Sequence, residues 1–315
     1  METQIQNILV TGSEGGIGQY IIRELYRQND NISVIRTSRN PCEDKDGISK
    51  YYHGDLTDSA VYKKIFSENR IDTVIACAAL WNGINQDQNV LITNTLLITV
   101  LLYAVPPTVK NVIFFSSSAV YSDDNYDDRV PLRMFPSSTY GASKLFSEEL
   151  LVKTAQIKDF TYTIYRPFHV VSPAEIYQPG RSHVCTDFCY KIISKDNTFQ
   201  FEALGDTNGI GFTWVEDVAD TVVRNIENAK AHNQIFNIGT EEEYSIRALA
   251  LEISEVAYEK KLIDTPTPKL ECVTINHQTD GRFNKLNGLN SDALKTNFKT
   301  LIQKFISEKY LKEYK

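Results

Sequence analysis

The stretch ILVTGSEGGIGQYI, residues 8–21, joins an apolar β-branched run to an amphipathic helical pattern through Gly12, Gly15 and Gly18. Glycine accepts the backbone angles of a tight turn, and because it lacks a Cβ it lets backbone N–H groups come close to a ligand. A helix that begins directly after the turn points its positive end at the same place, which suits a pyrophosphate. The glycines between strand and helix therefore predict a dinucleotide-binding loop.

Short apolar runs and amphipathic helical patterns alternate onward from this loop. Strands are expected at residues 6–11, 32–36, 72–77, 111–116 and 161–166, with helices near 17–28, 58–69, 89–104 and 139–156. Such alternation indicates an α/β fold with a Rossmann-type, doubly wound parallel sheet between two helical layers.

The pattern becomes less regular after about residue 167, where prolines interrupt the chain. We expect an NAD(P)-binding domain over residues 1–167 and a smaller α/β C-terminal substrate lobe over residues 168–315. The lobe is expected to be interleaved with the last elements of the sheet, at about residues 212–240.

Composition narrows the classes of function. Of the 315 residues, 42% are hydrophobic and 23% are charged, which are ordinary globular values. A net charge of −7 argues against a nucleic-acid-binding protein. We expect no membrane span and no signal peptide, because no apolar stretch has the required length or flanks. The five scattered cysteines suit the reducing cytoplasm, where we expect the protein, and predict no metal site.

A tyrosine and a lysine stand four residues apart in TYGASK, residues 139–144. Residues at i and i+4 lie on one face of a helix, so Tyr140 and Lys144 are expected to be about one turn apart. Two interpretations follow from these residues alone: an ordinary surface pair, or a phenol whose proton is made available by a neighbouring ammonium. The spacing does not separate them.

Taken together, the motifs resemble those of the short-chain dehydrogenase/reductase superfamily. TGSEGGIG has that family's glycine spacing, and GDLTD (54–58) resembles its segment whose aspartate, here Asp55, meets the adenine ring. ACAAL (76–80) resembles its small-residue strand end beside the cofactor, and YRPF (165–168) resembles a strand end that flanks the nicotinamide. FSSSAVY (115–121) looks like its catalytic-serine strand, and TYGASK looks like its YxxxK element. TWVEDVAD (213–220) is similar to a signature of the extended branch, the NAD(P)-dependent epimerase/dehydratase family, whose members mostly act on nucleotide-activated sugars.

This resemblance implies a catalytic set of Ser117, Tyr140 and Lys144. Tyr140 would be the general acid/base, with a pKa lowered by the Lys144 ammonium, which would also hold the nicotinamide ribose. The S-x-x-x-Y register that ends at Tyr121 selects Ser117 as the serine that orients the reacting oxygen. The alternative Ser118 stays open because the strand ends there.

The same resemblance places the dinucleotide along the carboxyl ends of the strands. The residues expected to contact it, besides Tyr140 and Lys144, are Gly12, Gly15, Gly16, Ile17, Gly18, Arg36, Ser38, Arg39, Asp55, Leu56, Ala78, Ala79, Asn94 and Pro167. VIRTSRN, residues 34–40, has two arginines and no carboxylate where a ribose 2′-hydroxyl would bind, and guanidinium groups bind a 2′-phosphate well. NADP(H) is therefore the expected cofactor, with NAD(H) as the alternative.

The cofactor bears on the reaction. Similar enzymes that consume reduced cofactor often use NADPH, so we expect a net reductase of a 4-keto nucleotide sugar. An NAD-dependent nucleotide-sugar 4-epimerase is the alternative within the family, and a non-catalytic dinucleotide-sensing or interaction protein is the alternative outside it.

The same resemblance predicts which residues contact the substrate and which helices form a dimer interface. A nucleotide-diphosphate sugar is expected to contact Ser118, His169, His183 and Arg282. Similar enzymes commonly dimerise through helices that here span about residues 86–104 and 139–157, so a homodimer is expected.

Overall fold

The computed structural model of the protein describes residues 6–29, 31–39, 49–81, 87–121, 134–194, 209–240, 242–266, 294 and 296–311. Within these residues a seven-stranded sheet has the order β10-β6-β5-β4-β1-β2-β3, and every neighbouring pair is parallel. The strands are β1 (Gln6–Thr11), β2 (Ile32–Ser38), β3 (Lys50–His53), β4 (Thr73–Ala76), β5 (Asn111–Phe115), β6 (Thr161–Pro167) and β10 (Gln234–Ile238). The predicted doubly wound parallel sheet is confirmed.

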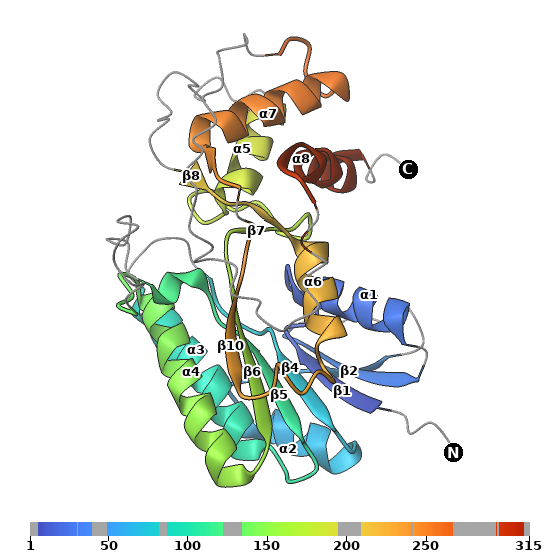
Figure 1. Cartoon of the computed structure of the whole chain (residues 1–315), viewed down its shortest axis with the longest axis vertical. Helices are drawn as coiled ribbons and strands as arrows, with labels where there is room; N and C mark the ends of the chain where they lie inside the picture. The colour runs from blue at the N-terminus through green and yellow to red at the C-terminus, as the bar shows by residue number, and fades with distance from the viewer. Residues whose placement is uncertain are drawn as a thin grey trace.

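Helices cover both faces of this sheet. One face is covered by α1 (Gly18–Gln28) and α6 (Val215–Arg224), which lie side by side, and the other by α2 (Ser59–Glu68), α3 (Gln88–Ala104) and α4 (Thr139–Lys158) (Figure 1). Each helical layer packs against the sheet to form a buried apolar cluster. The first cluster includes Ile21 and Val218, and the second includes Ile98 and Leu151. Because the central strands are buried on both faces, they carry unbroken apolar runs such as residues 112–115.

The strands predicted at 6–11, 32–36, 72–77, 111–116 and 161–166 agree with β1, β2, β4, β5 and β6 to within two residues at each end. The edge strand β3 is missing from the prediction because its sequence, KYYH, is short and lacks an apolar run. Both of its end residues, Lys50 and His53, are exposed, as expected of a strand at the margin of a sheet.

The chain leaves the sheet after β6 and forms a smaller lobe beyond the carboxyl ends of the strands (Figure 1). The lobe contains α5 (Val184–Ile193), α7 (Ile246–Glu259), α8 (Phe298–Ile306) and a π-helical turn (Ser307–Leu311), with short strand pairs β7 (Val170–Val171) and β9 (Thr213–Trp214), and β8 (Gly209–Ile210) and β11 (Tyr244–Ser245).

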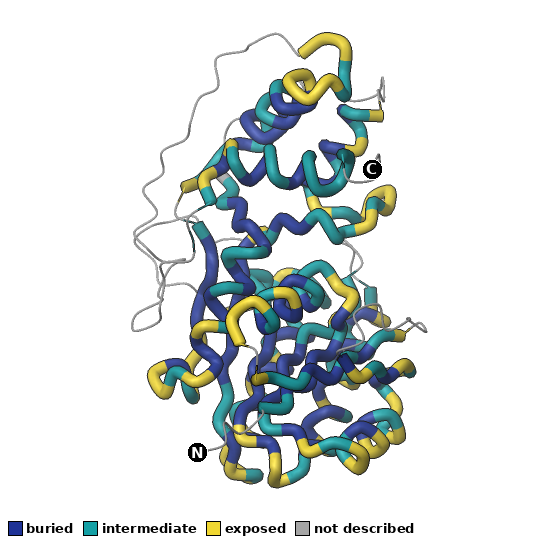
Figure 2. Tube along the Cα trace, turned by 90° about the vertical axis from the view of Figure 1, so that its right-hand side faces the viewer, coloured by how far each residue is buried: buried dark blue, intermediate teal, exposed yellow. Residues whose placement is uncertain are grey.

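A separate apolar core holds this lobe together. Trp214, Leu249, Ile253 and Phe305 are among its fully buried members. Figure 2 shows buried segments both in this lobe and in the sheet below it. The chain then returns through β9 and α6 to β10, so the lobe is tied to the sheet at β6 and at β10. Among the described residues, no helix combines the length and the apolar character needed to cross a membrane.

Candidate active site

The strand order reverses between β1 and β4, which places a crevice at their carboxyl ends. Thr11 ends β1, and its hydroxyl accepts a hydrogen bond from the Ala78 N–H at 3.2 Å. Gly12 follows with a φ of 64°, and a Cβ on it would lie 2.7 Å from the Ala78 Cα. A side chain would not fit, so glycine at this position lets the loop close tightly against the end of β4.

The loop leads directly into α1. The Gly15 N–H donates to the Gly12 carbonyl at 2.9 Å, and a Cβ on Gly18 would lie 2.3 Å from the same oxygen. Ile17 is the N-cap and makes no side-chain capping hydrogen bond, while the Gly16 carbonyl accepts from a serine of the lobe at 2.7 Å. A compact glycine turn at the positive end of a helix, beside the point where the strand order reverses, fits the pyrophosphate of a dinucleotide.

The other residues predicted to contact the dinucleotide lie along neighbouring strand ends. Their positions are Arg36 and Ser38 in β2, Arg39 after it, Asp55 and Leu56 after β3, Ala79 after β4 and Pro167 at the end of β6. Leu56 and Asn94 have buried side chains. The Asn94 amide accepts from the Leu80 N–H at 2.7 Å and donates to the Leu80 carbonyl at 3.0 Å, so it holds the chain after β4 in place.

The predicted catalytic residues come together at the start of α4. The N-cap is Ser138, whose hydroxyl accepts a backbone N–H of the first turn at 3.0 Å. Tyr140 lies in this turn with its hydroxyl near Ser117, close enough for the serine to lower the pKa of the phenol slightly. Lys144 is buried one turn later, where its ammonium donates to the Phe115 carbonyl at 2.7 Å and lies 5.7 Å from the centre of the Tyr140 ring. Tyr140 and Lys144 are therefore not a surface pair.

Burial dominates the electrostatics of this set. Burial raises the pKa of Tyr140 to about 12, because it outweighs the hydrogen bond from Ser117. Burial also lowers the pKa of Lys144 to about 8. The expectation that the Lys144 ammonium lowers the pKa of the phenol is therefore wrong for the protein alone. The ammonium is directed at the end of β5, and the loss of solvent favours the neutral form of both groups.

Behind the candidate serines lies a buried ion pair that the sequence motifs did not predict. Glu148 on α4 accepts hydrogen bonds from the Ser116 hydroxyl and from the Arg166 guanidinium, whose Nε lies 2.9 Å away. Arg166 also donates to the Tyr121 hydroxyl at 2.7 Å. Ser116 is thereby turned away from the crevice. The one sequence signal for this network is a carboxylate four residues after Lys144, on the same helical face.

Trp81, which follows β4, is a second residue that no motif predicts. Its indole lies edge-on to Tyr140 with the ring centroids 4.9 Å apart, and it stacks on His183 with a centroid distance of 5.0 Å and an interplanar angle of 9°. Its Nε1–H donates to the Arg181 carbonyl at 3.1 Å. Trp81 therefore bridges the sheet and the lobe directly beside the candidate acid/base.

Both histidines predicted to contact substrate lie in this region. His183 is the N-cap residue of α5, and its Nδ1 lies 2.9 Å from the Glu175 carboxylate. His169 follows β6 with a φ of 40°, a strained conformation of the kind that clusters at functional sites. The His169 side chain is exposed to solvent, but protein packed around the rest of the ring lowers its pKa to about 4, first by desolvation and then through the charge of His183. Ser118 begins a short 3-10 turn (Ser118–Val120), and Arg282 lies outside the described residues.

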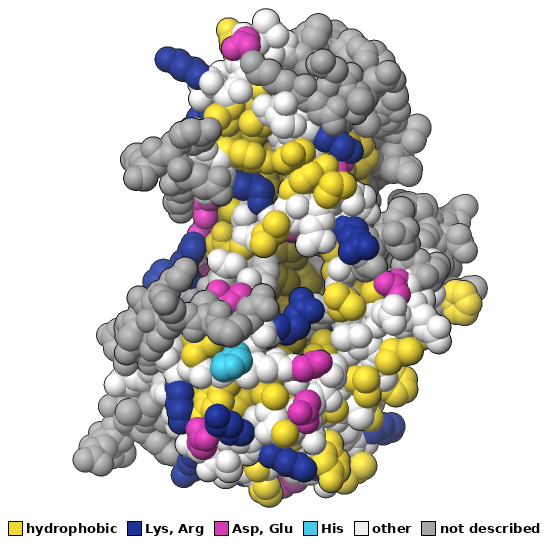
Figure 3. All heavy atoms as spheres, turned by 180° about the vertical axis from the view of Figure 1, so that it is seen from behind, with side chains coloured by type: hydrophobic (Ala, Val, Ile, Leu, Met, Phe, Trp, Pro, Cys, Tyr) yellow, Lys and Arg dark blue, Asp and Glu magenta, His cyan; other side chains and the backbone are white. Residues whose placement is uncertain are grey.

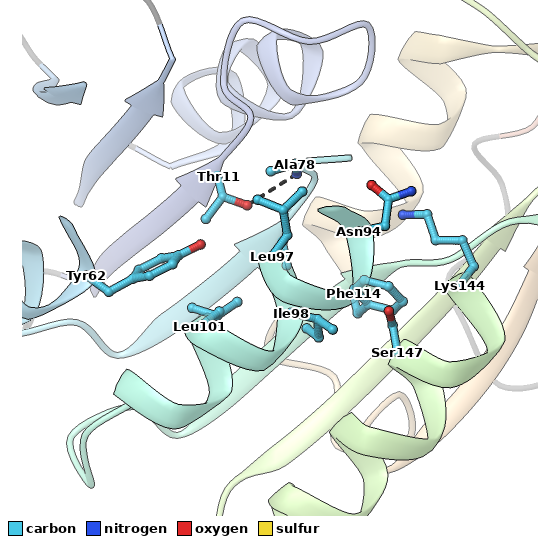
Figure 4. Close-up of a pocket in the computed structure, with 11 residues that line it drawn as sticks. Thr11, Tyr62, Ala78, Asn94, Leu97, Ile98, Leu101, Phe114, Lys144 and Ser147 are labelled. Carbon is cyan, nitrogen blue, oxygen red and sulfur yellow. Dashed lines mark hydrogen bonds between the residues drawn. The ribbon is translucent and has the colours of Figure 1, made fainter. Parts of the chain in front are cut away.

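The described part of the molecule has a small cavity inside it and a hollow on its surface. A small cavity between the sheet, α3 and α4 has Lys144 and Asn94 at one end and Tyr62 and Leu101 at the other (Figure 4). Its volume of about 10 Å³ admits at most one water molecule, so it is not a dinucleotide site. On the surface, Figure 3 shows a hollow between the sheet and the lobe with hydrophobic side chains in it. Because Trp81 contacts both Tyr140 and His183 of the lobe, the crevice between the sheet and the lobe is the candidate active site.

Comparisons with known proteins agree with this geometry. The chain matches the model of the NAD dependent epimerase/dehydratase family over residues 8–239, a span that runs from β1 to just past β10. A UDP-glucose 4-epimerase from Lactobacillus helveticus is 27% identical over 286 residues, which cover 82% of this chain and 83% of the relative. A putative UDP-glucose 4-epimerase from Methanocaldococcus jannaschii is 29% identical over 259 residues, which cover 77% and 79% of the two chains.

Solved structures share the fold. A UDP-glucose 4-epimerase from Thermotoga maritima, solved with UDP-glucose, superposes with a TM-score of 0.78 at 22% identity, covering 98% of this chain and 100% of that one. A Thermus thermophilus UDP-glucose 4-epimerase solved with NAD superposes with a TM-score of 0.73 at 20% identity, covering 96% and 98% of the two chains. Identities this low bear on the fold alone, whereas the family model spans the glycine loop and Ser117, Tyr140 and Lys144. The chain therefore belongs to the NAD dependent epimerase/dehydratase family.

Proposed function

We propose that the protein is an NAD-dependent 4-epimerase of a nucleotide-diphosphate sugar. The observation that carries the proposal is the position of Tyr140: its hydroxyl lies near Ser117, the Lys144 ammonium lies 5.7 Å from its ring centre, and both are at the strand ends that also hold the glycine loop. The relatives that are named as 4-epimerases support this activity over the net reductase predicted from the arginines near the end of β2.

In this reaction Tyr140 moves the proton and Ser117 positions the oxygen. During oxidation at C4, Tyr140 takes the proton of the sugar hydroxyl while hydride leaves the same carbon, and in the reverse step it returns the proton to that oxygen. Ser117 fixes the oxygen beside the phenol by a hydrogen bond. When bound, an oxidised nicotinamide would accept and return the hydride, and its positive charge would lower the pKa of the phenol from the value of about 12 in the protein alone.

Inversion at C4 constrains how the sugar is held. The hydride must leave one face of the sugar carbon and return to the other, while Tyr140 stays fixed on α4. The keto sugar must therefore turn over within the crevice. Trp81, His183 and His169 border this space, and His169 is neutral at physiological pH because its pKa is about 4. It is suited to an uncharged hydrogen bond with a sugar hydroxyl rather than to an ion pair with the diphosphate.

The test is to follow UDP-glucose and UDP-galactose with the purified protein and NAD+, by NMR and by nicotinamide absorbance. We expect interconversion of the two sugars with no net change in reduced cofactor. Tyr140→Phe should lower kcat by about 10²–10⁴-fold. Tyr103→Phe is the matched control, because Tyr103 on α3 is 73% exposed and far along the helix from the site.

Two outcomes would overturn the proposal. Stoichiometric consumption of NADPH by a 4-keto nucleotide sugar, without epimerisation, would establish the reductase instead. Full activity of the Tyr140→Phe variant would remove the proposed role of the phenol, whatever sugar is used.

Homodimer formation is part of the proposal. Ile92, Leu96 and Tyr103 are exposed on α3, and Phe146 and Ile157 are exposed on α4, which packs beside it. Two adjacent helices with exposed apolar side chains are typical of a face that pairs with a second copy. Light scattering in solution tests this part independently of activity.

A further inference from the structure

The glycine-rich loop carries a carboxylate that the mechanism above does not use. Glu14 stands between Gly12 and Gly15, in the turn that would approach the pyrophosphate. A negative charge is unexpected there, because the ligand is itself an anion. Its surroundings indicate what it does.

Glu14 reaches across to the end of β2, where the adenosine ribose is recognised in this fold. Its Oε1 lies 2.8 Å from the Arg36 guanidinium, and the same oxygen accepts a hydrogen bond from the Tyr51 hydroxyl. Arg36 also stacks over the Tyr51 ring, with its Cζ 4.9 Å from the ring centre. The side chain of Arg36 is only 13% exposed. The guanidinium is therefore held in place and its charge is compensated before any ligand arrives.

The second arginine of this segment is also near a carboxylate. Arg39 is exposed beside Asp55, whose pKa is lowered by the Thr57 backbone N–H and hydroxyl and then by the charge of Arg39. Arg36 is therefore paired with one carboxylate, and Arg39 lies within electrostatic range of a second. A 2′-phosphate would meet a compensated surface, with the Glu14 carboxylate beside the nearest guanidinium, whereas a 2′-hydroxyl can donate to a carboxylate.

We propose that Glu14 makes the protein select NAD over NADP, by neutralising Arg36 and placing a negative charge where the 2′-phosphate would bind. This inference rests on the proposed NAD-dependent function, and it reverses the NADP(H) preference expected from the arginines alone. The carboxylate expected at the end of β2 of an NAD-binding protein is supplied here from the glycine loop, 22 positions earlier in the chain.

The test is calorimetric titration of the full-length protein with NAD+ and with NADP+, without sugar. Adenosine 5′-monophosphate and adenosine 2′,5′-bisphosphate serve as probes of the ribose end alone. We expect the wild type to bind NAD+ at least about tenfold more tightly than NADP+. Glu14→Gln, which keeps the shape but removes the charge, should shift the ratio of the two dissociation constants toward NADP+ by about tenfold. Glu14→Gln combined with Arg36→Met should lose that shift.

The control is Glu149→Gln, which removes one exposed negative charge from α4 and should leave the ratio unchanged. A wild type that binds NADP+ as tightly as NAD+, or a Glu14→Gln ratio equal to that of the control, overturns the inference and leaves the proposed function standing. If neither the wild type nor any variant binds NAD+ or NADP+, both the inference and the proposed function are overturned. Circular dichroism of each variant verifies that it is folded.

Discussion

The buried ion pair of Glu148 and Arg166 makes a quantitative prediction about stability. The two side chains are 3% and 8% exposed, so both charges are almost fully withdrawn from water. Glu148→Gln keeps the shape of the side chain but leaves the guanidinium without its counter-charge. Removing one partner of a buried pair costs about 3–5 kcal/mol. We expect the lower end, about 3 kcal/mol, because Arg166 keeps its hydrogen bond to Tyr121 at 2.7 Å.

Urea unfolding followed by tryptophan fluorescence measures this loss. With a slope of about 3 kcal/mol per molar, a loss of about 3 kcal/mol lowers the unfolding midpoint by about 1 M. Lys191→Met is the matched control, since it breaks a partly exposed i,i+4 pair with Asp187 at 2.7 Å. Such a pair contributes about 0.5 kcal/mol or less, so its midpoint should move by no more than about 0.2 M.

A double variant distinguishes the effect of the unpaired charge on stability from the effect of lost packing. Glu148→Met with Arg166→Met leaves no buried charge, and apolar replacement of both partners is often neutral or stabilising. We expect its midpoint to lie closer to that of the wild type than the midpoint of Glu148→Gln. The reasoning is refuted if Glu148→Gln moves the midpoint no further than Lys191→Met, or if the double variant is less stable than the single one.

Further predictions concern the pH dependence, the crevice, the helix start and the dimer. The pKa of Lys144 is about 8 in the folded protein, against an ordinary 10.5, so between these two pH values the unfolded chain binds more protons than the folded one. The stability of the wild type should therefore rise relative to that of Lys144→Met as the pH increases through this window. A difference between their urea midpoints that does not change with pH would contradict this. Trp81→Ala should raise KM for the nucleotide sugar by about tenfold, and Trp81→Phe should raise KM by less. Calorimetry should find the NAD+ affinity of both variants unchanged. A loss of NAD+ affinity of about tenfold in Trp81→Ala would count against a contact between Trp81 and the sugar. Gly141→Ala should destabilise the protein by about 1–3 kcal/mol in urea unfolding and lower kcat, because the new Cβ would lie 2.0 Å from the Ala119 carbonyl oxygen; wild-type behaviour would mean that this contact relaxes freely. Leu96→Glu should convert a dimer to a monomer in light scattering without changing the circular dichroism spectrum, and an unchanged mass would place the interface elsewhere.

Local features of the sequence were sufficient for the framework of the fold. The turn at Gly12 and the alternation of apolar strands with helical patterns depend on backbone angles and on periods of two and 3.6 residues, which neighbouring residues determine. The same is true of Tyr140 and Lys144, whose spacing places them on one helical face. These features predict the parallel sheet and the position of the crevice, but they do not distinguish an epimerase from a reductase.

What only the tertiary structure decided is which distant groups meet and how deeply they are buried. Glu14 compensates Arg36, and Trp81 stacks on His183, across separations in the chain that no local period encodes. The pKa of Tyr140 rises to about 12 instead of falling, because desolvation depends on the protein packed around the phenol and here exceeds the effect of its hydrogen bond. The sequence determined where the chemistry is located, and three-dimensional packing determined the charge state of its groups.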